Sequence, residues 1–199
     1  AKARLADVTF AEGEVRLKRD PRKAVAISEI LRQSGTDAIE EEASTKPDSR
    51  KHKAFSRHTH AAVFAEVKVD ELLGIVRVTR VVSAVAAGRI LNPKTARSQV
   101  LGGVVMGIGM AMEEETVVDH NLGRIVTRDL ANYHVPVNAD VRDIEVIFVE
   151  ERDEVVNPLG AKGLGEIGIV GTAAAIANAV YHATGKRVRD LPITLDKLL

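Results

Sequence analysis

The strongest chemical signal in the sequence is a glycine-rich turn that carries a single carboxylate. Five of the 15 glycines fall within GAKGLGEIGIVG, residues 160–171, just before an uncharged segment that predicts a helix over 167–185. Glu166 stands in this turn among Leu164, Ile167 and Ile169. Apolar surroundings favour a general base, whereas the N–H groups of a helix start hold a carboxylate ionised. Two roles for Glu166 therefore stay open, general base and helix cap.

The same glycines formally match the GxGxxG pattern of dinucleotide-binding folds over 163–168. In that motif a strand leads directly into the glycines, but here the preceding strand, predicted over 143–151, ends well before them. The phosphate-loop pattern GxxxxGK[ST] is absent because Arg187 follows Gly185 and Lys186. A nucleotide-binding loop of either kind is not expected.

A second glycine-rich element is the helix that Asn92 and Pro93 predict, running to about Glu114. Its four glycines are Gly102, Gly103, Gly107 and Gly109. Each weakens a helix by about 1 kcal/mol relative to Ala, so we expect close approach of another backbone or of a flat ligand. Lys94 and Arg97 in the first turn oppose the helix dipole; they suit a bound phosphate, or they are simply exposed charges.

Two other groups of residues have less specific readings. His58 and His60 could share one face of a strand, but no third metal ligand is in view, so hydrogen-bonded or exposed histidines are expected and no metal ligand is assigned to this chain. The segment 36–57 combines EEE with the basic run RKHK. It predicts a solvated polar loop, with a partner-docking site as the alternative.

The remaining patterns predict an α+β fold with mixed strands and three or four helices. Alternation over 8–19 predicts two strands around Gly13, and Pro21 predicts a helix that Gly35 ends. A long hairpin is expected over 61–82 with Gly74 in its turn. A turn at 119–123, a short strand at 124–127 and the strand over 143–151 complete the pattern.

Composition excludes several classes of function. The 28 Lys and Arg balance 28 Asp and Glu, and only six residues are aromatic, so a nucleic-acid partner is not expected. The lack of cysteine excludes disulfides, thiolate metal sites and iron–sulfur clusters in this chain. No signal peptide is expected at AKARLADVTF, and 167–185 fits a buried helix better than a membrane span. The compartment stays open, cytoplasmic or periplasmic.

Four motifs, in order, resemble the C-terminal part of the molybdopterin-binding large subunit of the molybdenum hydroxylases, the xanthine dehydrogenase and aldehyde oxidoreductase family. They are FAEVKVDELLGIVRV (64–78), GRILNPKTARSQVLGGVVMGIGMAMEEE (88–115), NPLGAKGLGE (157–166) and AIANAVYHATGKRVRDLPIT (175–194). Ala86-Ala87-Gly88 is most similar to the bacterial aldehyde oxidoreductase branch. Residues 1–60 match only loosely. The resemblance implies a fragment of the cofactor-binding domain over 58–199, preceded by a strand/helix segment and polar loop over 1–57.

The resemblance also implies roles for individual residues. In the family the glutamate of this turn is the general base, and Glu166 occupies that position. The residues expected near the pterin, on the glycine-rich helix and the loop beside it, are Gln99, Gly102, Gly103, Lys162, Gly163 and Gly165. The implied reaction converts aldehydes to carboxylic acids with water-derived oxygen. Hydroxylation of xanthine or another N-heterocycle is the alternative within the class, and a non-catalytic assembly module with Glu166 as a cap is the alternative outside it.

Cofactors and partners follow from the same resemblance. The expected cofactor is a molybdenum-pterin, in its cytosine dinucleotide form, with iron–sulfur clusters and FAD on partner subunits or domains. The expected partners are the remainder of the large subunit, the iron–sulfur and flavin subunits, and an aldehyde or N-heterocycle substrate. As a fragment of the large subunit, the chain alone is expected to be inactive.

Overall fold

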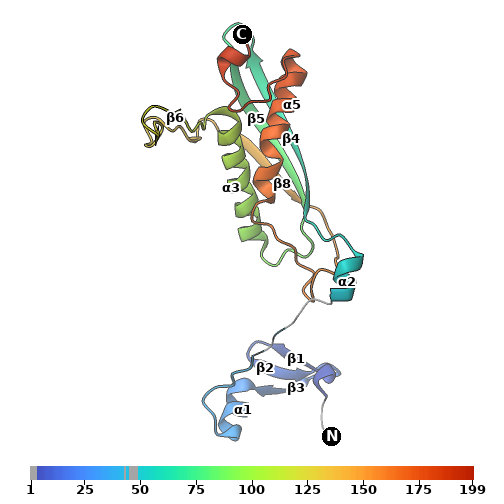
Figure 1. Ribbon diagram of the computed structural model, residues 1–199. Helices are drawn as coiled ribbons and strands as arrows, with labels where there is room; N and C mark the ends of the chain where they lie inside the picture. Colours follow the sequence, from blue (N-terminus) through green and yellow to red (C-terminus); the bar gives the residue numbers. More distant parts are fainter. Residues whose placement is uncertain (1–3, 43, 45–48) are drawn as a thin grey trace. The chain divides into compact units, whose positions relative to one another are not determined.

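Strands and helices occur in both of the units into which the chain divides, residues 1–46 and 47–199. The computed structural model describes residues 4–42, 44 and 49–199. The expected α+β class with mixed strands is confirmed. The two units are described separately below (Figure 1).

The first unit is a small antiparallel sheet followed by one helix. After the 3-10 helix η1 (Leu5–Asp7), strands β1 (Val8–Ala11), β2 (Glu14–Leu17) and β3 (Asp20–Ala26) pair in the order β1-β2-β3. The hairpin expected around Gly13 is confirmed. Glu12 and Gly13 both have positive φ, +53° and +76°, as a two-residue hairpin turn with the twist of its strands requires.

The prediction that a helix begins at Pro21 is wrong. Residues 20–26 form strand β3, and helix α1 (Ile27–Ser34) begins only afterwards. Pairing with β2 outweighs the helix-start signal of Pro21, and because β3 is an edge strand, the missing proline N–H is tolerated. The predicted stop is confirmed, because Gly35 adopts φ +67° directly after α1.

A three-stranded sheet forms the frame of the second unit. Strands β4 (His60–Asp70) and β5 (Ile75–Ala86) make the expected antiparallel hairpin, with Gly74 in its turn at φ +66°. Strand β8 (Asp143–Phe148) pairs parallel to β5, from Arg80 opposite Asp143 to Val85 opposite Phe148. The chain between β5 and β8 therefore crosses over the sheet, and the longest element of this crossover is one helix.

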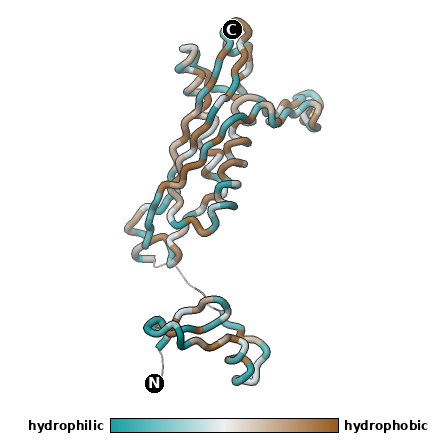
Figure 2. Tube along the Cα trace, turned by 180° about the vertical axis from the view of Figure 1, so that it is seen from behind, coloured by the Kyte–Doolittle hydropathy of each residue, from teal (hydrophilic) through white to brown (hydrophobic). Residues whose placement is uncertain are grey.

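That crossover helix, α3 (Pro93–Met112), and helix α5 (Thr172–Thr184) run along the sheet (Figure 1). The start predicted at Asn92 is confirmed, since its side chain accepts hydrogen bonds from the N–H groups of Lys94 and Thr95. Buried side chains from strands and helices form one core, which includes Val81, Val85, Val100, Val104, Val146, Ile176 and Val180. Figure 2 shows the corresponding apolar stretches along these elements.

The remaining elements of the second unit are short. The segment 36–57, expected as loop, contains helix α2 (Ser49–Ala54), and residues 43 and 45–48 lie outside the described chain. Strands β6 (Val118–Asp119) and β7 (Arg124–Ile125) pair around the predicted turn, and their hairpin stands away from the sheet and helices (Figure 1). The 3-10 helix η2 (Leu195–Lys197) follows near the end.

The uncharged segment expected as one buried helix is broken and buried on one side. Helix α4 (Ile167–Val170) is separated from α5 by Gly171. Ile176 and Val180 are fully buried, whereas Val170 is 72% exposed. By length and composition alone, 167–184 is apolar enough to cross a membrane.

Candidate functional site

The glycine-rich turn is joined to the end of β5 by backbone hydrogen bonds. The Lys162 N–H donates to the Ala87 carbonyl at 3.0 Å, and the Arg89 N–H donates to the Gly160 carbonyl at 2.8 Å. Gly88 lies between these bonds with φ +64°, and a Cβ there would lie 2.1 Å from the Gly160 oxygen. Only glycine fits this approach, so residues 87–89 hold the beginning of the turn in place.

Two side chains from other elements hold the rest of the turn. The Gln99 Nε2 atom of α3 donates to the Gly165 carbonyl at 2.7 Å. Thr59, just before β4, donates its hydroxyl to the Gly163 carbonyl at 2.5 Å. The turn is therefore fixed between α3 and the start of β4, and the structure brings the predicted site residues Gln99 and Gly165 into contact.

Glu166 lies at the end of this fixed turn, directly before α4, and its side chain is exposed. Its apolar neighbours Leu164 and Ile167 pack against the core, so the described residues do not form the apolar wall expected around the carboxylate. The carboxylate makes no capping hydrogen bond to α4. Among the described residues nothing binds it, which disfavours the helix-cap reading.

The glycines of α3 and of the turn fall into two groups. A Cβ on Gly103 would lie 2.9 Å from the Ile169 nitrogen, and one on Gly168 would lie 2.7 Å from the Val100 oxygen. These two glycines allow the backbones of α3 and α4 to touch. Close approach of another backbone was one of the two explanations predicted for the glycines of this helix. Gly107 similarly admits the side chain of Thr172.

Gly102, Gly163 and Gly165 belong to the second group. A Cβ at any of the three would meet no atom of the described chain within 4 Å. None of them has the positive φ that would demand glycine. Gly102 lies on the same face of α3 as Gln99, one turn further along. The absence of side chains here leaves room for a group from outside this chain.

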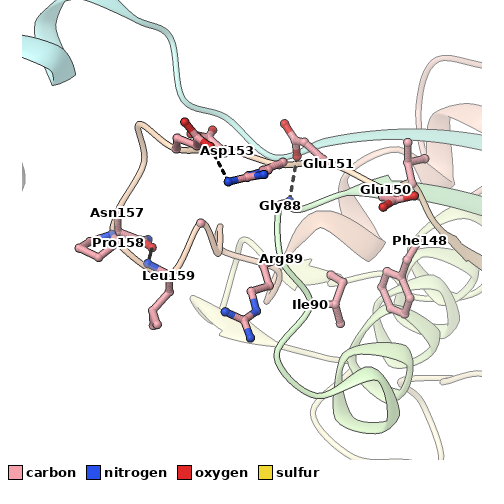
Figure 3. Close-up of a pocket in the computed structure, with 14 residues that line it drawn as sticks. Gly88, Arg89, Ile90, Phe148, Glu150, Glu151, Asp153, Asn157, Pro158 and Leu159 are labelled. Atoms are coloured by element: carbon pink, nitrogen blue, oxygen red, sulfur yellow. Dashed lines mark hydrogen bonds and ion pairs between the residues drawn. The ribbon is translucent and has the colours of Figure 1, made fainter. Parts of the chain in front are cut away.

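Lys162 is placed differently from the other predicted cofactor contacts. Its side chain is only 6% exposed, and its Nζ lies 2.5 Å from Glu151 and 3.2 Å from Asp153. Glu151 also accepts the Gly88 N–H at 2.8 Å, which Figure 3 shows. Sequence reasoning missed both carboxylates, although the acidic run EERDE at 150–154 is the signal that could have pointed to them.

The ion pairs shift the ionisation of all three groups. The hydrogen bond to Glu151 raises the pKa of Lys162. The pKa of Glu151 is lowered by Lys162 and then by the Gly88 N–H. The pKa of Asp153 is lowered first by the N–H groups of Val156 and Val155, and less by Lys162. The cluster is charged at neutral pH.

Acid should therefore weaken this part of the structure. Because the carboxyl pKa values are lowered in the folded chain, their contribution to stability is present above the ordinary carboxyl range and is lost as pH falls through the lowered values. The lysine contribution persists up to the ordinary lysine range and is lost only above it. We expect the difference in thermal midpoint between wild type and Glu151→Gln to shrink as pH falls below 4. A difference independent of pH would contradict the ion pairs.

A cavity of about 430 Å³ adjoins the turn and the first turns of α3. Three predicted site residues line it, Gln99, Lys162 and Gly165, but Glu166 does not. Asn92 already occupies two N–H groups at the start of α3, and Arg97 donates to the Val146 carbonyl at 3.4 Å. These contacts favour the interpretation of Lys94 and Arg97 as exposed charges over a phosphate-binding site at this helix start.

His58 and His60 were expected to share one face of a strand, but they do not. Strand β4 begins at His60, so His58 precedes it, and the His58 carbonyl accepts a hydrogen bond from Lys162 at 3.3 Å. In the part of the chain that the structure describes, no group of three or more His, Asp or Glu side chains is arranged to hold a metal ion.

Comparison with known proteins defines the class. A family model for the molybdopterin cofactor-binding domain matches residues 1–142, so the chain belongs to this family. The match begins at residue 1, whereas the four motifs that carry the resemblance begin at Phe64. The chain belongs to the molybdenum-containing aldehyde oxidoreductase and xanthine dehydrogenase family.

Particular relatives are similar over about two thirds to three quarters of this chain. The chain is 56% identical over 147 residues to the aldehyde oxidoreductase molybdenum-binding subunit PaoC of Escherichia coli K12, covering 74% of this chain and 20% of that protein. It is 40% identical over 135 residues to the putative xanthine dehydrogenase molybdenum-binding subunit XdhA of the same organism, covering 68% and 18%. The chain thus spans about a fifth of the length of these curated relatives.

The fold agrees with solved structures of the class. Quinoline 2-oxidoreductase from Pseudomonas putida 86 superposes with a TM-score of 0.79 at 24% identity, covering 98% of this chain and 26% of that one. Both units therefore have counterparts in a known fold, each considered by itself.

Proposed function

We propose that this chain forms part of a molybdenum-dependent subunit that oxidises aldehydes to carboxylic acids, with Glu166 as the general base. The similarity at 56% identity to an aldehyde oxidoreductase subunit supports the substrate class. The observation that carries the proposal is the turn itself. Its backbone is held by Gln99, Thr59 and the end of β5, whereas its one carboxylate projects without a partner in the described chain.

The residues around the turn fit a bound molybdenum-pterin. Gly102, Gly163 and Gly165 leave open space that neither a neighbouring atom nor the backbone conformation explains. We propose that these glycines, with Gln99, contact the cofactor, expected in its cytosine dinucleotide form. When bound, this cofactor accepts the two electrons that the substrate carbon loses.

The chain's own contribution to the chemistry is a fixed proton acceptor. Oxidation of an aldehyde to an acid adds one oxygen from water and releases two protons and two electrons. Glu166 takes one proton from the attacking oxygen and, because its side chain is exposed in this chain, can pass the proton to water. Gln99 keeps the carbonyl of Gly165 in place, so the backbone that carries the carboxylate is already ordered before the reaction. Electrons would leave through iron–sulfur clusters and FAD on partner subunits.

The test uses the full-length subunit purified with its partners. We expect bound molybdenum with pterin, and turnover of aromatic and aliphatic aldehydes well above turnover of xanthine and hypoxanthine. Preference for the purines would favour the N-heterocycle alternative, which the 40% identity to a xanthine dehydrogenase subunit keeps open. A complex that carries neither molybdenum nor pterin would contradict the enzyme and favour a non-catalytic assembly module.

A further inference from the structure

We propose that Lys162 is a positioning residue for Glu166 and not a contact of the cofactor. The inference rests on the proposed function, since it concerns how the base is held. Lys162 directly precedes Gly163 and stands four positions before Glu166 in the chain. Any movement of its backbone is therefore transmitted to the turn that carries the base.

The donor capacity of Lys162 is fully used within the chain. A lysine ammonium has three N–H donors. Three acceptors lie around its Nζ, the carboxylates of Glu151 at 2.5 Å and Asp153 at 3.2 Å and the carbonyl of His58 at 3.3 Å. With only 6% of the side chain exposed, no donor remains directed at a ligand.

The acceptors connect Lys162 to the surrounding frame. Glu151 accepts from Gly88, at the end of β5, and Asp153 accepts from the N–H groups of Val155 and Val156. The His58 carbonyl belongs to the segment that leads into β4. One buried cation thus joins three segments, the end of β5, the loop after β8 and the approach to β4.

Removing the cation would leave two partly exposed carboxylates close together without a counter-charge. Such a pair repels itself and gains by opening to water. The loop 149–163 would then lose one of its ties to the frame while the backbone bonds to residues 87–89 remain, and Glu166 would shift with the loop. A misplacement of about 1 Å at a reacting group can cost about 10²-fold in rate. The expected defect is therefore in the chemical step, not in binding of the cofactor.

The test compares Lys162→Met, Lys162→Arg and Glu151→Gln in the full-length complex, with exposed Lys68→Met on β4 as a control. We expect Lys162→Met to lower kcat per bound molybdenum about 10- to 100-fold, with KM and molybdenum content little changed. Arginine, which keeps the charge, should restore most of the turnover. Glu151→Gln should lower kcat in the same direction, and the double variant should be no worse than the more impaired single variant.

Each other result overturns the proposal. Loss of molybdenum in Lys162→Met but not in Glu151→Gln would make Lys162 a cofactor contact. A lower thermal midpoint with unchanged turnover per molybdenum would make the cluster merely structural. If Lys162→Met does not assemble, Glu151→Gln with wild-type turnover decides against the proposal. Failure of the proposed function is separate, because it shows as turnover retained in Glu166→Gln.

Discussion

Glu166→Gln is expected to abolish most turnover while leaving the protein folded and loaded with molybdenum. The amide keeps the size of the side chain but cannot accept the proton. Removal of a general base typically costs about 10²–10⁴-fold. Because the carboxylate is exposed and makes no capping bond to α4, its replacement removes no contact within the described chain. The loss should appear in kcat with little change in KM, measured as turnover per bound molybdenum.

The matched control is Glu71→Gln, another exposed glutamate, in the turn between β4 and β5. It should have wild-type kinetics. A helix cap predicts the reverse behaviour for Glu166→Gln, normal turnover with a loss of stability of about 1–2 kcal/mol. Turnover above about a tenth of wild type, against the ~10²-fold loss expected for a base, would contradict the catalytic assignment.

Gly103→Leu is expected to destabilise the subunit and to lower its molybdenum content together. A side chain at 103 meets the backbone of Gly168 and Ile169 at 2.9–3.0 Å, and neither atom belongs to a flexible group. Helix α4 must then move away from α3, and the turn with Glu166 moves with it. Overpacking of this kind costs about 1–3 kcal/mol or more, against a gain of about 1 kcal/mol in helix propensity. Thermal midpoint and metal content of the full-length subunit measure both effects.

Gly102→Leu is the informative comparison, because a Cβ at this position meets no neighbouring atom of the described chain within 4 Å. The Gly102→Leu subunit produced without molybdenum should be at least as stable as wild type produced in the same way, since leucine is a better helix former than glycine. Its molybdenum content should nevertheless fall if the open glycines accommodate the cofactor. Full occupancy in Gly102→Leu would refute that role, and wild-type stability in Gly103→Leu would refute the contact between α3 and α4.

Signals that act within a few residues predicted their elements well. The two hairpins were expected from alternation and from Gly13 and Gly74, whose positive φ values the turns require. The start of α3 followed from Asn92 and Pro93, because a capping side chain and a proline act on the first turn alone. The glycine-rich turn and Glu166 could likewise be singled out from composition and motif.

Long-range contacts decided the rest. Residues 20–26 became a strand because pairing with β2 satisfies their backbone groups, which no local rule at Pro21 anticipates. The two kinds of glycine in α3 look alike in the sequence, and only the approach of α4 separates Gly103 from Gly102.

The candidate site likewise has features that the sequence predicts and features that only the tertiary structure determines. Residue types singled out Glu166 as a group able to act as a base, and the family resemblance predicted Gln99 and Gly165 beside the pterin. Tertiary structure decided that Lys162 is directed into the protein, because its partners come from segments that the sequence places up to 104 residues away. In the same packing Leu164 and Ile167 lie against the core and Glu166 stays exposed, because the burial of an apolar side chain depends on what packs beside it and not on the order of residues in a turn.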